Sequence, residues 1–416
     1  MPTALVLDDQ VPPTGLRRGV PGTVLALGAV SFFTDISSEA VVAVLPLYVT
    51  AVLGMSPLAY GFLDGVYQGV SAVVRVLGGW WADRTQRSKE VALLGYGVSA
   101  VSRFLLLPAS GFGALTGTVA LDRLGKGLRT GPRDALIAGA SAEHQLGRNF
   151  GVHRAMDTAG ALVGPLAAFA ILMSIPVGLG GYRSVFVLSA AAAVVGLAVL
   201  VLAVPGRSPR VIAAAAEAGP RMRWRDLTDP RLRRVLVAAG LLGLLTVGDG
   251  FLYLVLAGAG TFGASWFPLL MVGTNAVYLL LAVPLGRLAD RVGRARVFLG
   301  GHLALVGAYV LTATQLGGAA WVIAVLALLG TFYAATDGVL AAIASRLVPP
   351  ASRASGIAAA QTVVALSRFG SSVGFGLLWT LTGRSTAMVV VAVGLTAVLP
   401  VAAGLLRLRR TAEASS

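Results

Sequence analysis

The chain has 416 residues, of which 56% are hydrophobic and only 12% charged, so it lacks the polar side chains needed to cover a soluble domain. Its net charge of +15 would favour nucleic-acid binding in a soluble protein, but here the basic residues collect in turns between apolar runs. It has no cysteine, which excludes disulfides, thiolate metal sites and a cysteine nucleophile. Because apolar runs of about 18 residues recur, we predict an all-α polytopic membrane protein without nucleic-acid partners.

About twelve spans are predicted in chain order. The first six cover residues 23–53, 57–82, 90–108, 112–138, 150–173 and 184–204. The seventh begins at Asp229-Pro230, with Asp as the N-cap and Pro in the first turn, and the others cover 261–289, 297–314, 319–347, 354–381 and 386–406. The predicted organisation is a cytoplasmic tail (1–22), an N-terminal six-helix bundle (23–204), a cytoplasmic linker (205–229), a C-terminal six-helix bundle (230–406) and a cytoplasmic tail (407–416).

Lys and Arg are concentrated in every second turn. Arg17 and Arg18 precede the first span, eight arginines crowd residues 207–234, and the alternate turns carry little more than Arg183 and Arg384. By the positive-inside rule, this asymmetry places both termini in the cytoplasm. The N-terminus does not read as a cleavable signal, because Asp8 and Asp9 interrupt its basic leader. A multi-pass location in the cell (inner or plasma) membrane is therefore expected.

Two charged turns share the opening Gly-x-x-Ala-Asp-Arg. The first contains Gly79, Asp83 and Arg84, and the second, about two hundred residues later, contains Gly286, Asp290 and Arg291. These turns resemble the signature loop of the major facilitator superfamily of secondary transporters, and the resemblance covers about residues 23–406. We expect the two turns to act as gating latches, in which each Asp faces a helix end and each Arg pairs with a carboxylate.

Other segments repeat between the halves. Asp134-Ala-Leu-Ile-Ala in the fourth span matches Asp337-Gly-Val-Leu-Ala in the tenth, and Gly160-Ala-Leu-Val-Gly matches Gly370-Ser-Ser-Val-Gly. Two parallel halves of six spans are the internal symmetry of this transporter fold. The substrate is then expected between the halves, near the midplane of the bilayer.

Charged residues inside the spans are costly and are therefore functional candidates. Asp35 and Glu39 lie four residues apart on one face of the first span, where two carboxylates can share a proton. Asp249 occupies the comparable depth of the seventh span. These three residues are predicted to take part in proton coupling or to line the substrate cavity.

The fourth span carries Asp122, Arg123 and Lys126. Asp122 can pair with Lys126 along the helix, which leaves Arg123 to find a partner on another helix or on the substrate. Asp35 and Glu39 are the best acidic candidates, and Asp157 is next. Gly125, Gly127 and Gly131-Pro132 predict a bend or break, and Arg129 and Arg133 are expected to snorkel towards water. Arg123 followed by Gly127 resembles the fourth-span motif of the superfamily, whose Arg is tied to proton coupling.

The fifth span contains Gly160, Gly164 and Pro165, which resemble the antiporter motif of the superfamily and should let helices pack closely. His153, near the end of this span, is expected to make a structural contact. Further buried charges are expected at Asp64, Arg75, Arg103, Asp337 and Arg368. Arg368 is the deepest cation of the C-terminal half. It is suited to face an anionic substrate or to neutralise Asp249 or Asp337.

These features predict a secondary active transporter that works by alternating access. No nucleotide-binding loop, nucleophile–base set or soluble output domain is found, so an ion gradient is the expected energy source and neither an enzyme nor a sensor is expected. Proton-coupled export of a small organic compound is the first choice, because of Arg123, Gly127 and Gly164-Pro165. Proton-coupled uptake of a small anion, through Lys126, Arg123 and Arg368, is the alternative, and divalent-metal movement through Asp35, Glu39 and Asp249 is a third. We expect a monomer with no cofactor and no resident metal.

Overall fold

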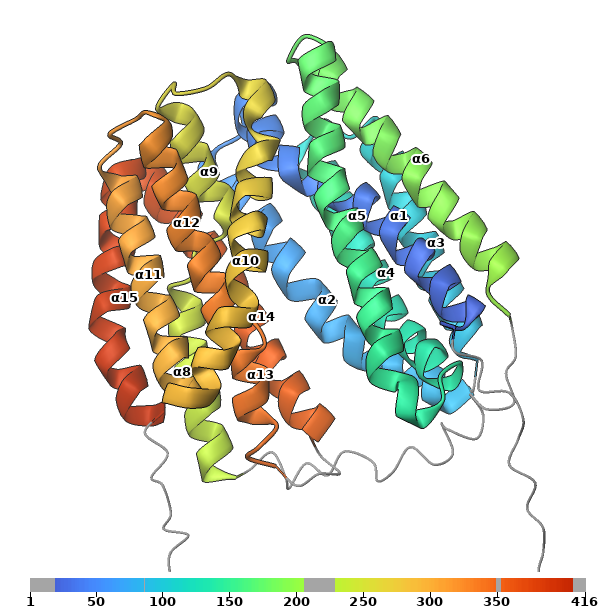
Figure 1. Ribbon diagram of the computed structural model, residues 1–416. Helices are drawn as coiled ribbons and strands as arrows, with labels where there is room; N and C mark the ends of the chain where they lie inside the picture. Colours follow the sequence, from blue (N-terminus) through green and yellow to red (C-terminus); the bar gives the residue numbers. More distant parts are fainter. Residues whose placement is uncertain (1–18, 86, 206–228, 349–352, 407–416) are drawn as a thin grey trace, which may run out of the picture.

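The computed structural model describes residues 19–85, 87–205, 229–348 and 353–406 (Figure 1). Within these ranges, the side chains of residues 72, 73, 75–85, 143 and 353–355 fall outside the described part. Gly79, Asp83 and Arg84 of the first signature turn are among them, although the backbone of this turn continues a helix. Most of the two predicted tails and of the linker also lie outside the described residues.

The N-terminal half contains six long helices, each starting or ending at a polar or glycine-containing turn. α1 (Gly22–Leu47) continues as a π-helical turn, η1 (Tyr48–Val52), directly after Pro46, whose ring interrupts the regular hydrogen-bond ladder. The others are α2 (Pro57–Thr85), α3 (Ser88–Leu106), α4 (Phe112–Gly139), the 3-10 turn η2 (Glu143–Gln145), α5 (Leu146–Ser174) and α6 (Leu179–Ala203).

The C-terminal half repeats this order with shorter pieces: α8 (Pro230–Leu244), α9 (Asp249–Gly258), the 3-10 turn η4 (Ala264–Trp266), α10 (Pro268–Val292), α11 (Arg294–Ala313), α12 (Ala319–Thr336), α13 (Val339–Ala344), α14 (Arg353–Thr382) and α15 (Arg384–Leu406). Asp229 caps α8 as predicted, because its carboxylate accepts a hydrogen bond of 2.6 Å from the backbone N–H of Arg231.

Two predicted spans are not continuous helices. The seventh is divided into α8 and α9 by residues 245–248, where the hydroxyl of Tyr309 accepts from the N–H of Val247 (2.8 Å) and donates to the carbonyl of Leu245 (3.1 Å). The tenth is divided into α12 and α13 at Asp337 and Gly338, and Gly338 has a φ of 75°. In the seventh span, a side chain from another helix thus replaces part of the backbone ladder that the sequence led us to expect.

Of the bend or break predicted in α4, the break is wrong, because α4 is one continuous helix from Phe112 to Gly139. Its glycines serve close packing instead. A Cβ on Gly125 would lie 2.5 Å from the carbonyl oxygen of Gly95 on α3, so only a glycine allows the two backbones to approach this closely.

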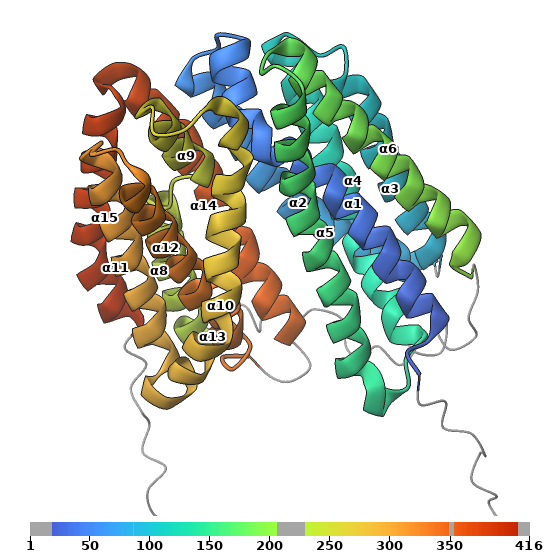
Figure 2. The same ribbon diagram turned by 45° about the horizontal axis from the view of Figure 1, so that its top comes forward.

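Within the described residues, nine helical segments are long and apolar enough to cross a membrane. Together with α2, α3 and α4, they make the predicted twelve. Figures 1 and 2 show the two halves as neighbouring bundles. We call the end at which α6 ends and α8 begins the linker end, and the opposite end, at which α1 passes into η1, the η1 end.

The halves are packed together towards the η1 end. A Cβ on Gly376 of α14 would lie 2.7 Å from the carbonyl oxygen of Pro57 on α2, and one on Gly61 would lie 2.3 Å from that of Ser372. The rings of Phe169 and Trp266 join α5 to η4 at 5.4 Å. Towards the linker end the helices of the two halves diverge in both views (Figures 1 and 2).

Candidate functional site

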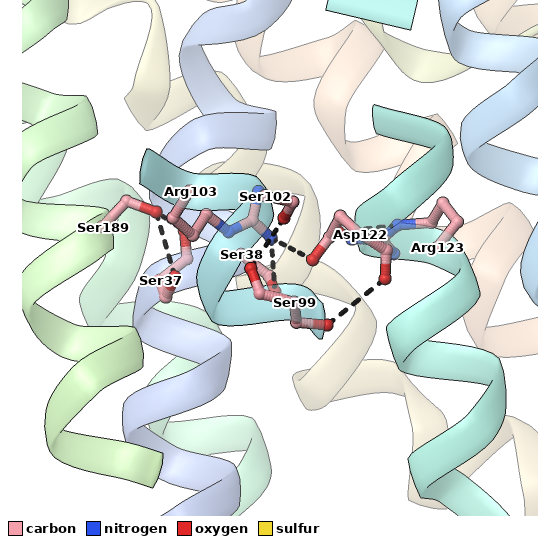
Figure 3. A network of polar contacts seen from close by, with 8 residues as sticks. All are labelled: Ser37, Ser38, Ser99, Ser102, Arg103, Asp122, Arg123 and Ser189. Carbon is pink, nitrogen blue, oxygen red and sulfur yellow. Dashed lines mark hydrogen bonds and ion pairs between the residues drawn. The ribbon is translucent and has the colours of Figure 1, made fainter. Parts of the chain in front are cut away.

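A buried ion cluster ties α3, α1 and α4 together in the N-terminal half (Figure 3). Arg103 of α3 lies 2.7 Å from one oxygen of Asp122 and also donates to the hydroxyl of Ser38 at 3.1 Å. The other oxygen of Asp122 accepts hydrogen bonds from Arg123, through Nε at 2.9 Å and through a terminal nitrogen. All three charged side chains are buried, so one carboxylate faces two guanidinium groups in a water-poor setting, and the trio keeps a net positive charge.

This arrangement differs from the predicted one. Asp122 pairs with Arg103 and Arg123 rather than with Lys126, and Arg123 pairs with its own neighbour rather than with Asp35, Glu39 or Asp157. Arg123 also lies 3.9 Å above the ring of Tyr67, which stabilises a cation. Arg103 was expected only to be a buried charge, because its partner is nineteen positions away on another helix and no local spacing points to it.

Serine hydroxyls surround this cluster. Ser189 of α6 donates to the carbonyl of Ser37 at 2.7 Å, and Ser99 donates to the carbonyl of Asp122 at 3.3 Å (Figure 3). These short side chains add hydrogen bonds from α6 to α1 and from α3 to α4 beside the ions. The cluster is therefore a rigid, fully buried anchor for the helices around it.

A second set of charged groups lies next to the first, where α1 meets α5. The side chains of Asp35 and Asp157 lie within hydrogen-bonding reach of each other, so the two carboxyl groups can share a proton. Lys126 lies within electrostatic reach of Asp35 and Glu39, and has no ion pair within 4 Å among the described residues. Asp35 was expected to share a proton with Glu39 on its own helix, but the carboxyl group within hydrogen-bonding reach of it is that of Asp157 on α5.

Gly160 and Gly164 explain why Asp35 and Asp157 can meet. A Cβ on Gly160 would lie 2.3 Å from the carbonyl oxygen of Phe32, and one on Gly164 would lie 2.8 Å from that of Ile36. Both glycines therefore let α5 touch the backbone of α1, with Pro165 directly after the second contact. The small residues of the fifth span position the carboxyl pair.

Three further residues close the linker end of this set. Arg133 lies 2.9 Å from Asp134 and 3.7 Å from Asp157. His153 is buried and shares a hydrogen bond of 2.9 Å with the hydroxyl of Ser31, which is the structural contact expected for it. The prediction that Arg129 snorkels towards water is wrong, because its side chain is only 3% exposed and its guanidinium lies 4.5 Å from the ring of Tyr96.

The C-terminal half holds a different arrangement around the break between α8 and α9. Asp249, the first residue of α9, accepts a hydrogen bond of 2.6 Å from the hydroxyl of Tyr333. Asp64 of α2 accepts one of 2.5 Å from Ser372 of α14, and so joins the halves. The sequence placed Asp64 only among several buried charges, since its partner lies 308 residues away.

Arg368 of α14 lies beside these carboxylates but has no ion pair within 4 Å in the described part of the chain. Its guanidinium is 5.7 Å from the ring of Tyr333, and its buried Nε has no hydrogen-bond partner among the described residues. It lines a cavity of about 320 Å³ that also receives Gln68 of α2, Thr246, His302 and Asp337. Asp249 and Arg368, both predicted site residues, therefore belong to one region.

The second signature turn lies at the linker end. Asp290 is exposed and pairs with Arg294 at 2.9 Å, and Arg294 also donates to the carbonyl of Ala342 on α13 at 3.3 Å. Arg291, also exposed, makes no ion pair in the described part of the chain. The turn thus connects α10 and α11 to the short helix α13 through Arg294, which the motif did not single out.

In the described residues, no three His, Asp or Glu side chains come together in a way that would hold a metal ion. Asp35 and Glu39 lie in the N-terminal set, and Asp249 lies with Tyr333 and Arg368 in the C-terminal half. The residues proposed for divalent-metal movement are therefore divided between two sites.

Comparison with known proteins gives a consistent assignment. The family model described as Major Facilitator Superfamily matches residues 27–372. An uncharacterized MFS-type transporter of Methanocaldococcus jannaschii, MJ1317, is 29% identical over 383 residues, which cover 89% of this chain and 91% of that protein. An uncharacterized protein of Mycobacterium tuberculosis, Rv2265, is 31% identical over 150 residues, which cover 36% of each chain.

Solved structures share the fold at low identity. The nucleoside transporter NupG superposes with a TM-score of 0.75 at 14% identity, and the match covers 93% of this chain and 100% of that one. A bacterial homolog of the human lysosomal transporter Spinster, in an inward-facing and occupied conformation, has a TM-score of 0.74 at 16% identity, and the match covers 94% of this chain and 98% of that one. The match over residues 27–372 and the twelve-helix fold agree, and the chain belongs to the major facilitator superfamily of membrane transporters.

Proposed function

We propose that this transporter couples the movement of protons to the export of a small organic compound, by alternating access of one central site. The observation that carries this proposal is the close approach of the Asp35 and Asp157 carboxyl groups, because two carboxyls within hydrogen-bonding reach can share a proton. The pair lies between α1 and α5, and the contacts of Asp157 with Arg133 and Arg154 (3.7 and 3.6 Å) are longer than the 2.7 Å contact of Asp122 with Arg103. It is therefore the group best suited to gain and lose a proton during transport.

Lys126 supplies a means of coupling. When the shared proton leaves, Asp35 and Asp157 are both negative, and they attract the ammonium group of Lys126 more strongly. When a proton returns, this attraction weakens and Lys126 is freer to move towards Glu39. A change in proton occupancy thereby shifts α4 relative to α1, which is the kind of movement that alternating access requires.

The conformation supports one stage of such a cycle. The halves touch towards the η1 end through α2 and α14 and diverge towards the linker end. We infer from the placement of Lys and Arg that the linker end faces the cytoplasm of a cell membrane. In this orientation, the described state is the one that faces inward.

Infrared difference spectroscopy on the purified protein tests the shared proton without knowledge of the substrate. We expect a protonated-carboxyl band that is lost on raising the pH and is absent from both Asp35→Asn and Asp157→Asn. Glu90→Gln, which removes an exposed carboxylate at the start of α3, is the control and should leave the band unchanged. A band that persists in both amide variants would mean that this pair does not hold the proton.

Uptake of a small anion remains the second candidate, because Arg368 has no anionic partner within 4 Å in the described structure. Solutes whose levels differ between cells with and without the protein, tested in proteoliposomes under an imposed pH gradient, would decide between export and uptake. Proton-coupled export predicts that the solute moves in the direction opposite to the protons, and proton-coupled uptake predicts that the solute and the protons move in the same direction.

A further inference from the structure

The cavity beside Arg368 lies where both broken helices of the C-terminal half end. Thr246 belongs to the break between α8 and α9, Asp337 and Gly338 form the break between α12 and α13, and all three line the cavity. Gln68 of α2 closes it from the other half. Interrupted helices at the junction of two halves are a common setting for transporter binding sites, because their free backbone groups and side chains face a cavity.

The carboxylates near this cavity have hydrogen-bond partners, but the Nε of Arg368 has none in the described structure. Asp249, Asp64 and Asp337 each accept a hydrogen bond from a hydroxyl group, on Tyr333, Ser372 and Tyr278 respectively. Arg368 has no such partner: its Nε is buried and unbonded, and no carboxylate lies within 4 Å of it in the described part. A buried donor of this kind is costly, so an acceptor supplied by a bound solute would stabilise it.

The rest of the wall determines what kind of molecule fits. Phe298, Phe332, Leu340 and Val364 give it apolar surface, and the volume of about 320 Å³ is at the small end of the roughly 300–1,000 Å³ range of ligand pockets. A guanidinium group binds a carboxylate through two parallel hydrogen bonds, which a neutral amide cannot reproduce. Asp337 also lines the pocket but accepts a hydrogen bond from Tyr278, which leaves Arg368 as the charged group available to a solute. A small pocket with apolar walls and this cation suits a compact organic acid.

We infer that this pocket binds the carboxylate of a small organic acid, with Arg368 as its recognition residue and the apolar body of the solute against Phe298 and Phe332. This inference rests on the proposed function, that the protein carries a small organic solute. It assigns solute recognition to the C-terminal half and leaves the proton to Asp35 and Asp157.

The test is binding to the purified protein, measured as thermal stabilisation and by calorimetry, with matched pairs of an acid and its amide from acetate and acetamide to benzoate and benzamide. At least one acid should bind about tenfold or more tightly than its amide, since a charge-assisted pair is lost in the amide. Arg368→Gln should abolish that preference and Arg368→Lys should retain part of it, since a lysine keeps the charge but not the paired hydrogen bonds. Arg346→Gln, which removes an exposed arginine just after α13, should have no effect.

Two results would overturn the inference: no acid in the panel binds better than its amide, or the preference survives in a folded Arg368→Gln variant. The unfolding temperature without ligand shows whether that variant is folded, and Arg368→Lys provides a second variant if it is not. Failure of the proton proposal looks different, because Asp35→Asn should leave acid binding intact. Acid binding that depends on Arg368, without any flux driven by a pH gradient, would refute proton coupling alone.

Discussion

The two halves of this transporter share a helix order but treat their buried charges in opposite ways. In the N-terminal half, Arg103 and Arg123 bond directly to Asp122 on continuous helices. In the C-terminal half, Arg368 stands beside two helix breaks without an ion pair in the described structure. The comparison teaches that one repeat can pair its buried arginines with a carboxylate, whereas the other leaves a buried guanidinium Nε without a hydrogen-bond partner in the described structure.

The difference begins with the helices that carry the equivalent acidic residues. α1 is continuous around Asp35, so this side chain meets a partner on the adjacent α5. The equivalent span is interrupted just before Asp249, which thereby becomes the first residue of α9. The break before α9 leaves space next to the chain, whereas the continuous helix α1 leaves no such space around Asp35. The location of the cavity follows from this contrast.

The largest expected effect comes from removing the central carboxylate of the N-terminal cluster. Asp122→Asn leaves two buried guanidinium groups without their counter-ion, so we expect a loss of about 3–5 kcal/mol in the free energy of unfolding. Thermal unfolding of the purified protein measures it. Asp134→Asn, which removes the half-exposed partner of Arg133, is the matched control and should cost far less. Similar losses for the two variants would contradict the anchor role.

The second effect sharpens the contrast between continuous and broken helices. Tyr309→Phe removes the hydroxyl that bonds both Val247 and Leu245 in the break between α8 and α9. Each backbone group left unpaired is expected to lower the free energy of unfolding by about 1–3 kcal/mol. Hydrogen exchange at Val247 should speed up, and solute binding should weaken. Tyr182→Phe, at an equally buried position on α6, should leave the exchange of Val247 unchanged.

The third effect uses the glycine repeat that the two halves share. Gly160→Ala should push α5 away from α1, because its new Cβ would lie 2.3 Å from the carbonyl oxygen of Phe32. We expect the free energy of unfolding to fall by about 1–3 kcal/mol and the carboxyl groups of Asp35 and Asp157 to move apart. Gly374, in the matching glycine segment of α14, has open space for a Cβ, so Gly374→Ala should be tolerated. Equal tolerance of both changes would argue against close α1–α5 packing.

The smallest effect concerns the second signature turn. Asp290→Asn breaks an exposed ion pair with Arg294, so we expect the free energy of unfolding to fall by only about 0.3–0.5 kcal/mol. A buried latch would contribute more. Because the native chain has no thiol, cysteines introduced on each side of the bundle report the conformational balance through their labelling rates. A large shift towards either state would show that this turn holds the halves more strongly than its exposure implies.

The twelve helices and their division into two halves were predictable, because apolar length and repeated turns are local properties of the sequence. The breaks were not, since the break before Asp249 depends on Tyr309, about sixty residues further along the chain. The pairing of charges was predicted poorly for the same reason. Arg103 and Asp122 meet through the close approach of α3 and α4, which periodicity within one helix cannot reveal. The glycines of α5 could be identified from their spacing, but not the carboxyl pair they bring together.

The central claim is that the N-terminal half carries the proton while the C-terminal half carries the solute. Its most direct test is solute flux in proteoliposomes, with and without an imposed pH gradient, for the wild type and for the double variant Asp35→Asn/Asp157→Asn. We predict that the double variant loses gradient-driven accumulation but still exchanges labelled for unlabelled solute across the membrane. Full gradient-driven accumulation in that variant would contradict the claim.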